Sequence, residues 1–336
     1  MELTDKQIKD LVARRHPEYI KKKEHWDFLA STYAGGRAWF DDNIFRYFKE
    51  GDQEFKERLE RAYRFNHTRE VVNLINKYLF KEDIHRNVEE APEPIQKFWK
   101  RATRQNVSID GFMSALDLQS SIYGRVWVVV DSTMDSDAES VADEKKKDVR
   151  AYAYWISPQQ MLDMAWDDDG TIWALIVEVV RDDQDPFTSS ARNISVIVYG
   201  HVTSGIYSGK RLRKAPGMPV VGPQKLCLKI KANAKLGVVP VFPVDCIGES
   251  ESPYFSPSLI DDIAYLDRAV ANYLSNLDAI IQDQTFSQLA IPVQSLLPGD
   301  ENHAKVMEWG QNASSPMTRK VATSLFICRQ TLSKLR

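Results

Sequence analysis

Hydrophobic residues in the first 120 positions recur at spacings that are typical of amphipathic helices. A capping box that begins at Thr4 predicts a first helix, and an apolar stripe from Tyr19 to Tyr33 predicts a second, which stops at Gly35-Gly36. A longer helical pattern extends from Phe55 to Leu79. Aromatic residues cluster between the second and third patterns, and we expect them to pack in a core: Trp39, Phe40, Phe45 and Phe48.

From residue 122 onward the pattern changes to short β-branched runs, which are typical of strands. Val126 to Asp131 predicts a buried strand, and the polar residues 131–148, with seven acids and three lysines, predict a solvated loop after it. The turn signal Asp168-Asp169-Gly170 favours hairpins over βαβ units. Four more strands are predicted, at Tyr152–Ile156, Ile172–Val180, Ser195–Tyr199 and Leu226–Ile230.

The most regular pattern follows Ser256-Pro257, a pair that favours the start of a helix. Apolar residues then recur in steps of four and three, which is a heptad-like seam over about 30 residues, or roughly 45 Å of helix. The seam residues are Leu259, Ile263, Leu266, Val270, Tyr273, Leu277 and Ile280. Five aspartates lie off the seam, against the single base Arg268: Asp261, Asp262, Asp267, Asp278 and Asp283.

These patterns predict an α+β chain of four regions. Residues 1–120 are expected to be helical, residues 121–250 to be rich in antiparallel strands, and residues 251–291 to hold the long helix. Residues 292–336 are expected to be irregular.

Composition excludes several classes of protein. The 336 residues are 43% hydrophobic and 27% charged, which is ordinary for a folded chain and argues against wholesale disorder. Three scattered cysteines predict no disulfide framework and fit a reducing compartment. The charged N-terminus predicts no secretory signal, and the apolar runs are far shorter than the about 20 residues of a membrane helix.

Motifs that carry chemistry are not found, so we expect no enzymatic activity, no metal and no cofactor. The closest approach to a phosphate loop, at Gly205 and Gly209-Lys210, has the wrong spacing and lacks the hydroxyl residue. In the acidic loop, Ser136 and Ala142 stand where a calcium loop needs glycine and glutamate. The six histidines are scattered singly, no zinc-type Cys or His spacing occurs, and no GxSxG elbow exists.

Charge is unevenly distributed, although the formal net charge is only −3. Between Arg192 and Val244 there are nine bases and no acid, which is typical either of a solvated face or of a surface for an acidic partner or polyanion. Between Glu249 and Glu301 there are nine acids and one base, and such a surface repels nucleic-acid phosphates, as suits a conduit for DNA. The candidate partner-binding bases are Lys210, Arg211, Arg213, Lys214, Lys225, Lys229, Lys231 and Lys235.

Five segments, in order, resemble the portal proteins of tailed bacteriophages, and the nearest grouping is the SPP1-like portal superfamily. The first, Phe55 to Phe80, reads FKERLERAYRFNHTREVVNLINKYLF. The others are SSIYGRVWVVVD from Ser120, YWISPQQMLDMAWDDDG, the Pro-containing exit VVPVFPVD with the helix that follows it, and WGQNAS from Trp309. The resemblance covers the chain from about residue 25 to residue 314, and no single motif is specific, but five in the same order carry more weight than one.

The resemblance implies a structural protein of the virion: a closed homo-oligomeric ring of about twelve subunits, a dodecamer, at one capsid vertex. Such a ring takes part in DNA packaging and DNA ejection. Its implied partners are the large terminase, the major capsid and scaffolding proteins, the head–tail connector and double-stranded DNA that passes without sequence specificity. No membrane partner is implied, and assembly would take place in the host cytoplasm.

By the same resemblance, the helical and β-rich regions would form the wing and clip, and Pro257 to Gln284 a stem or tunnel-adjacent helix. Its seam would then contact neighbouring subunits and its aspartates would face the tunnel, while the basic segment would bind terminase or connector proteins. Portal proteins continue beyond the turn that WGQNAS resembles, whereas Met317 to Arg336 does not match that continuation. We therefore expect a C-terminally truncated chain: a gene fragment, a frameshifted remnant or a shortened variant.

Two other functions fit some of these patterns. The chain could be another phage head protein or a cytoplasmic scaffold that binds an acidic partner through its basic β segment, as a monomer or dimer. An enzyme acting on nucleic acid would need a cluster of metal-binding carboxylates, and adjacent acids such as Asp261 and Asp262 point in different directions on a helix.

Overall fold

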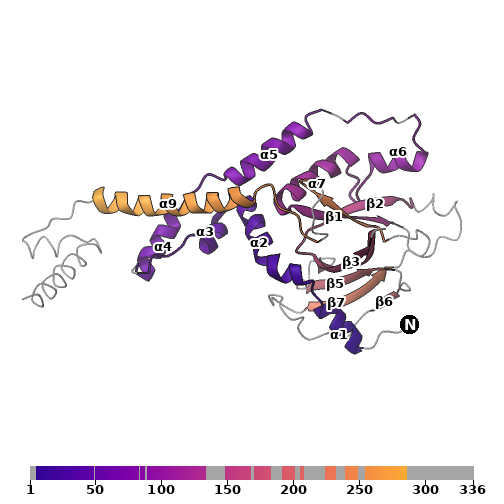
Figure 1. Ribbon diagram of the computed structural model, residues 1–336, viewed down its shortest axis with the longest axis horizontal. Coiled ribbons are helices and arrows are strands. Elements are labelled where there is room, and N and C mark those ends of the chain that lie inside the picture. Colours follow the sequence, from indigo (N-terminus) through magenta and orange to yellow (C-terminus); the bar gives the residue numbers. More distant parts are fainter. Residues whose placement is uncertain are drawn as a thin grey trace, which may run out of the picture. The chain divides into compact units, whose positions relative to one another are not determined.

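The computed structural model describes residues 5–48, 50–82, 84–87, 89–133, 148–167, 170–182, 191–200, 205–207, 224–231, 239–248 and 254–285 (Figure 1). It is an α+β protein, as predicted. The chain forms two compact units. The first is made of Met1–Phe45 and Arg64–Ala271, and the second of Arg46–Tyr63 and Asn272–Arg336.

The helices of the first unit are α1 (Asp5–Ala13), α2 (Pro17–Ala34), α3 (Arg37–Asn43), α5 (His67–Leu79), α6 (Glu93–Lys100) and α7 (Ile109–Tyr123). The second unit contains α4 (Asp52–Arg61), and α9 (Asp261–Thr285) runs from the first unit into the second. The prediction of a second helix that ends at Gly35 is confirmed, because Gly35 has a φ of 60° at the C-terminal end of α2. Thr4, the start of the predicted capping box, lies outside the described residues.

The helical pattern from Phe55 to Leu79 is not one continuous helix but two, α4 and α5. The helical conformation is interrupted at Ala62, which has non-helical backbone angles. Asn66 then starts α5 as its N-cap, since its side chain accepts a hydrogen bond from the Arg69 amide. The cap residue inside the apolar pattern is therefore the sequence signal for the break.

Within the part of the chain that the structure describes, the strands belong to the first unit and form two sheets. One sheet has the order β2-β1-β8 and the other the order β3-β4-β5-β7-β6. Their bounds are β1 Arg125–Ser132, β2 Ala151–Ile156, β3 Met161–Asp167, β4 Gly170–Asp182, β5 Ala191–Tyr199, β6 Gly205–Tyr207, β7 Gln224–Lys231 and β8 Val241–Asp245.

The five strands that the sequence predicts correspond to β1, β2, β4, β5 and β7, whereas β3, β6 and β8 were not predicted as strands. The pairing is antiparallel, as expected, except that β5 and β7 run parallel. The shorter β6 pairs with β7 on its other side. The acidic loop lies mostly outside the described residues, which resume at Asp148.

One continuous hydrophobic core joins the helices to both sheets of the first unit. Tyr254 lies at its centre, with ring centroids 6.4 Å from Trp26 on α2 and 5.8 Å from Trp127 on β1. The Tyr254 hydroxyl donates to the Met161 carbonyl at 2.6 Å, so the segment that precedes α9 is fixed to β3. The predicted strand at Val126 is confirmed as buried.

The expectation that the aromatic cluster packs in the core is partly wrong. Trp39 and Phe40 are buried, but Phe45 and Phe48 are 59% and 81% exposed. Trp39 is held in place because its indole N–H donates to the Thr32 hydroxyl at 3.0 Å. Phe45 and Phe48 follow α3 in a segment without regular structure, so no helical periodicity directs them inward.

Helix α9 begins four residues later than the sequence predicts, because the residues before it are held against the turn between α7 and β1. The Ser258 hydroxyl lies 3.0 Å from the Ser121 carbonyl and 2.7 Å from the Ile122 carbonyl. The Ser258 amide donates to the Asp261 carboxylate at 3.1 Å. This segment therefore stays outside the helix, with a turn at residues 259–260, and the first helical residue is Asp261.

Gly124, in the turn between α7 and β1, is expected to tolerate no side chain. Its φ is +84°, and an added Cβ would lie 2.1 Å from the Ser256 carbonyl oxygen and 2.6 Å from that of Pro257. Gly124→Ala should therefore lower the free energy of unfolding by about 3 kcal/mol, which urea denaturation can measure. Gly36→Ala is the matched control, because Gly36 also has a positive φ but an added Cβ there meets nothing within 4 Å. Equal losses in the two variants would show that the contact with Ser256 is unimportant.

Candidate functional site

Helix α9 exposes its larger apolar side chains and buries smaller ones. Residues Ala264, Asp267, Ala271 and Ser275 face inward and are at most 3% exposed. In the part of α9 that belongs to the first unit, Leu266 is 65% exposed and Val270 is 36% exposed. In the part that belongs to the second unit, three more seam residues are at least half exposed: Tyr273, Leu277 and Ile280.

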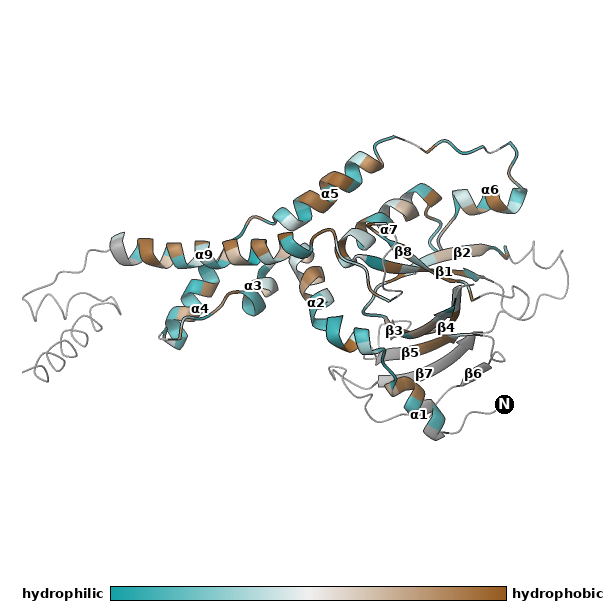
Figure 2. Cartoon of the chain, viewed as in Figure 1, coloured by the Kyte–Doolittle hydropathy of each residue, from teal (hydrophilic) through white to brown (hydrophobic). Residues whose placement is uncertain are grey.

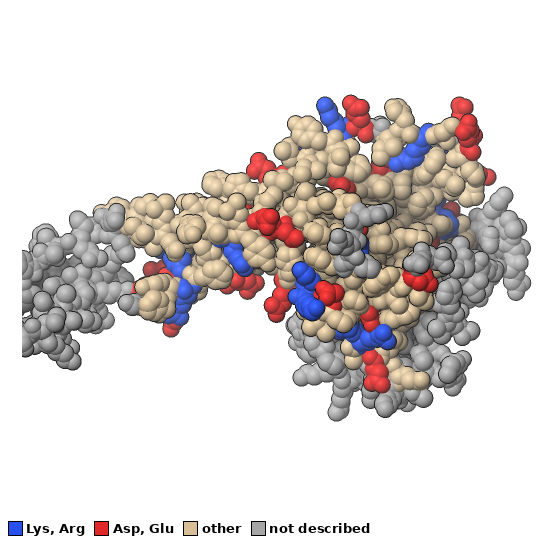
Figure 3. All heavy atoms as spheres, viewed as in Figure 1, with Lys and Arg blue, Asp and Glu red and all other residues tan. Residues whose placement is uncertain are grey.

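We call these five exposed residues the α9 stripe: Leu266, Val270, Tyr273, Leu277 and Ile280. The two other predicted seam residues, Leu259 and Ile263, are half-buried. Figure 2 shows hydrophobic positions along the whole of α9, and Figure 3 shows that the visible surface of this helix carries few charges. Within a single chain an apolar stripe normally faces the core, whereas these five side chains are exposed.

Asp267 does not face solvent, so its prediction as a tunnel-facing acid is wrong. Its side chain is 1% exposed and pairs with Arg64 at 3.1 Å between Oδ2 and Nη1. The Thr68 hydroxyl donates to the same carboxylate oxygen at 3.1 Å, and the His67 ring lies 3.4 Å from the other. A carboxylate with these partners fixes the first half of α9 to α5 and the residues before it.

Arg64 is the central residue of these contacts between α9 and the rest of the first unit. Its guanidinium lies 3.8 Å from the centroid of the Trp39 ring and donates to the Thr32 carbonyl, and its side chain is 5% exposed. Burial lowers the pKa of Arg64, and the Asp267 carboxylate acts in the opposite direction. Nearby, the Asn66 side chain donates to the Tyr33 carbonyl at 3.1 Å. The R-x-N-x-T part of the portal-like motif is thus the part of the sequence that holds α9 in the first unit.

Asp261 and Asp262 differ in their surroundings although they are neighbours. The Asp261 carboxylate lies 2.8 Å from Nε2 of His25, and Nδ1 of the same ring lies 3.1 Å from the Tyr265 hydroxyl. This contact, together with the Ser258 amide, ties the start of α9 to α2. Asp262 is exposed. Of these two, Asp262 therefore has the free surface that a channel-facing acid requires.

In the second unit, α4 is joined to the end of α9 by arginines. Asp278 pairs with Arg61 at 3.3 Å, so its charge is partly neutralised. Arg58 is 4% exposed, pairs with Glu50 at 2.7 Å and donates to the Ser275 hydroxyl at 2.9 Å. The hydrogen bond from Arg58 lowers the pKa of Glu50 below its ordinary value.

Several predicted site residues cannot be located. The side chain of Asp283 lies outside the described part of α9. Three of the predicted partner-binding bases have a described backbone on β7: Lys225, Lys229 and Lys231. Their side chains, and Lys210, Arg211, Arg213, Lys214 and Lys235 as a whole, lie outside the described residues.

The described residues contain neither a candidate metal-ion site nor a candidate membrane-spanning helix. No group of three or more His, Cys, Asp or Glu side chains among them is arranged to hold a metal ion. None of the described helices is both long enough and apolar enough to span a membrane.

Comparisons with known proteins do not extend these observations. Neither the models of known protein families nor the curated protein sequences contain a match to this chain.

Proposed function

We propose that this chain is a portal-type subunit, which assembles into a ring-shaped channel at a phage capsid vertex for DNA packaging and ejection. The proposal rests on the five ordered motifs and on one structural observation, the outward direction of the α9 stripe. Five exposed apolar residues at heptad spacing are unfavourable in an isolated subunit, because the exposure of apolar surface to water costs free energy. Packing against a helix of a neighbouring subunit removes this cost.

In this proposal the two faces of α9 have different tasks. The inner face holds the helix in its own subunit through Asp267 and Arg64. The α9 stripe packs against the next subunit, and exposed acids such as Asp262 remain for the wall of the channel, where they repel DNA phosphates. Terminase, connector, capsid and scaffolding proteins are the proposed partners of the ring, and the virion is its proposed location.

Native mass is the first test of this function. We expect light scattering of the purified chain to give a closed oligomer of about twelve subunits, with ring-shaped particles in negative-stain images of the same fraction. A monomer or dimer that binds an acidic protein would instead favour the scaffold function. A metal-dependent cleavage of nucleic acid by the purified chain would contradict both.

A further inference from the structure

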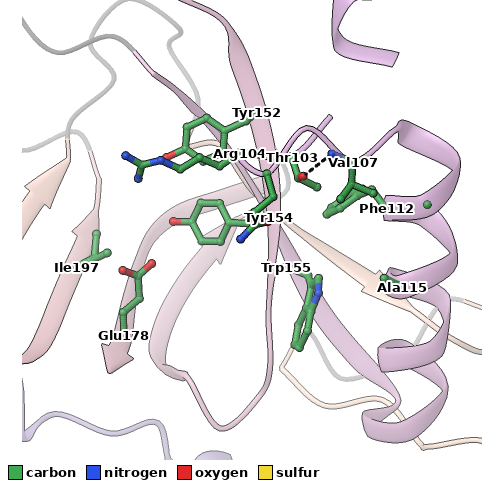
Figure 4. Close-up of a pocket in the computed structure, with 13 residues that line it drawn as sticks. Thr103, Arg104, Val107, Phe112, Ala115, Tyr152, Tyr154, Trp155, Glu178 and Ile197 are labelled. Carbon is green, nitrogen blue, oxygen red and sulfur yellow. Dashed lines mark hydrogen bonds between the residues drawn. The ribbon is translucent and has the colours of Figure 1, made fainter. Parts of the chain in front are cut away.

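A pocket of about 460 Å³ lies in the first unit, at the edge of β2. Its volume falls within the range of small-molecule sites, roughly 300–1,000 Å³. Its walls come from β2, from α7, from the loop that precedes α7 and from one residue each of β4 and β5. Figure 4 shows that Tyr154 points toward the β4 and β5 residues, Glu178 and Ile197, whereas Trp155 points toward α7.

Glu178 is the one carboxylate among the described residues that line this pocket. It shares one face of β4 with Ala174 and Ile176, which are both fully buried. Its partner across the β4–β5 pair is Ser195, which is also buried. A half-buried carboxylate beside these apolar side chains can accept a charge-assisted hydrogen bond from a cation. Among the described residues, no hydrogen bond or ion pair involves the half-buried Glu178 side chain.

The surroundings of Glu178 are aromatic and negative. Tyr152 and Tyr154 have ring centroids 6.1 Å apart, and the Tyr154 and Tyr199 hydroxyls lie 2.7 Å apart. The Tyr152 hydroxyl donates to Asp131 at 3.2 Å. Burial, followed by the Asp131 charge, raises the pKa of Tyr152 to about 12, so this phenol stays neutral. Among the described residues that line the pocket, Arg104 is the only base, and its side chain is exposed.

The rim of the pocket is held in shape before any ligand arrives. The Arg150 guanidinium donates to the carbonyls of Arg101 at 2.7 Å and of Thr103 at 3.0 Å. The Ala153 amide of β2 donates to the Ala102 carbonyl at 2.7 Å, and the Val107 amide donates to the Thr103 hydroxyl at 3.0 Å (Figure 4). A site that is already ordered loses little entropy when it binds a ligand.

We propose that this pocket binds an alkylammonium or guanidinium group, with Glu178 as the counter-ion and the faces of Tyr152 and Tyr154 as walls. A carboxylate provides the charge-assisted hydrogen bond, and electron-rich aromatic faces attract a cation further. The group could belong to a free amine or to a lysine or arginine side chain of another protein. This site is separate from the α9 stripe, so it does not depend on the proposed function.

Ligand-observed NMR titration tests the proposal, and it works for a monomer and for a large ring alike. The probes are N-acetyl-lysine methylamide and its uncharged analogue N-acetyl-norleucine methylamide. We expect the lysine probe to bind at least about tenfold more tightly, because only its ammonium group pairs with Glu178. N-acetyl-glutamate methylamide and butylammonium are two further probes. Equal affinities of the lysine and norleucine probes without binding of butylammonium would overturn the proposal, as would tighter binding of the glutamate probe through Arg104. Binding of butylammonium alone would indicate a free amine, and binding of the lysine probe as well would indicate a protein side chain.

Variants give an independent measurement. Glu178→Gln keeps the shape of the side chain and should lower the affinity for the lysine probe about tenfold. Glu24→Gln removes the same charge from an exposed position on α2 and should leave the affinity unchanged. Arg104→Gln should leave the affinity unchanged or raise it, and loss of binding in this variant would overturn the proposal. Circular dichroism establishes that each variant is folded, and the comparison of probes on the unaltered chain holds even where a variant is not.

Discussion

Replacing Asp267 by alanine is expected to lower the free energy of unfolding by about 4 kcal/mol, since it leaves the buried Arg64 charge without its partner. Both side chains are at most 5% exposed, so water cannot solvate the guanidinium that remains. The Thr68 hydroxyl loses its acceptor in the same variant. Urea denaturation followed by circular dichroism measures the change.

The control for this experiment lies on the same helix. Asp262→Ala removes the same group from an exposed position and should leave the free energy of unfolding nearly unchanged. A loss in Asp267→Ala that is as small as that of the control would mean that water reaches Arg64. A double variant, Asp267→Leu with Arg64→Leu, should be more stable than Asp267→Ala, because it leaves no buried charge unpaired.

Placing a charge in the α9 stripe is expected to abolish assembly without unfolding the subunit. Leu266→Asp should convert the proposed ring to monomers, because a subunit interface cannot bury an unpaired carboxylate without a large free-energy cost. Since the Leu266 side chain is 65% exposed within its own chain, the substitution removes little packing there. Light scattering gives the mass, and circular dichroism and thermal unfolding report the fold of the same sample.

Ile20→Asp provides a matched control for the stripe. Ile20 lies on α2 and is 68% exposed, so the substitution has the same chemistry at nearly the same exposure but away from α9. We expect this variant to keep the mass of the unaltered chain. Intact rings from Leu266→Asp would remove the α9 stripe from the subunit interface, and dissociation of both variants would show that any exposed charge of this kind prevents assembly.

Local sequence patterns were sufficient to predict most of the secondary structure. The stripe from Tyr19 to Tyr33 ends at a glycine because only glycine readily takes the positive φ that closes the helix there. The β-branched run at Val126 became a buried strand for an equally local reason. Periodicity did not show where α4 ends and α5 begins, because the Asn66 side chain starts a new helix inside an apolar pattern.

The sequence predicted which residues form the α9 stripe but not the direction in which the stripe faces. The spacing of Leu266, Tyr273 and Leu277 indicates that they share one side of a helix, since spacing alone sets their positions around it. Spacing does not determine whether that side faces inward or outward. In this structure Arg64 and Thr68 bind Asp267, which turns the opposite side of α9 toward the core. The same contacts remove Asp267 from the acids that could face DNA.

The sequence by itself determined the α+β class, five of the eight described strands and the existence of an apolar stripe, because these depend on residues near one another in the chain. Only the tertiary structure decided the direction of that stripe and the burial of Asp267, since its partner Arg64 is 203 positions away. It likewise brought Glu178 of β4 and Tyr154 of β2 into one pocket. Contacts between residues so far apart in the sequence depend on how distant elements pack, and local spacing does not predict them.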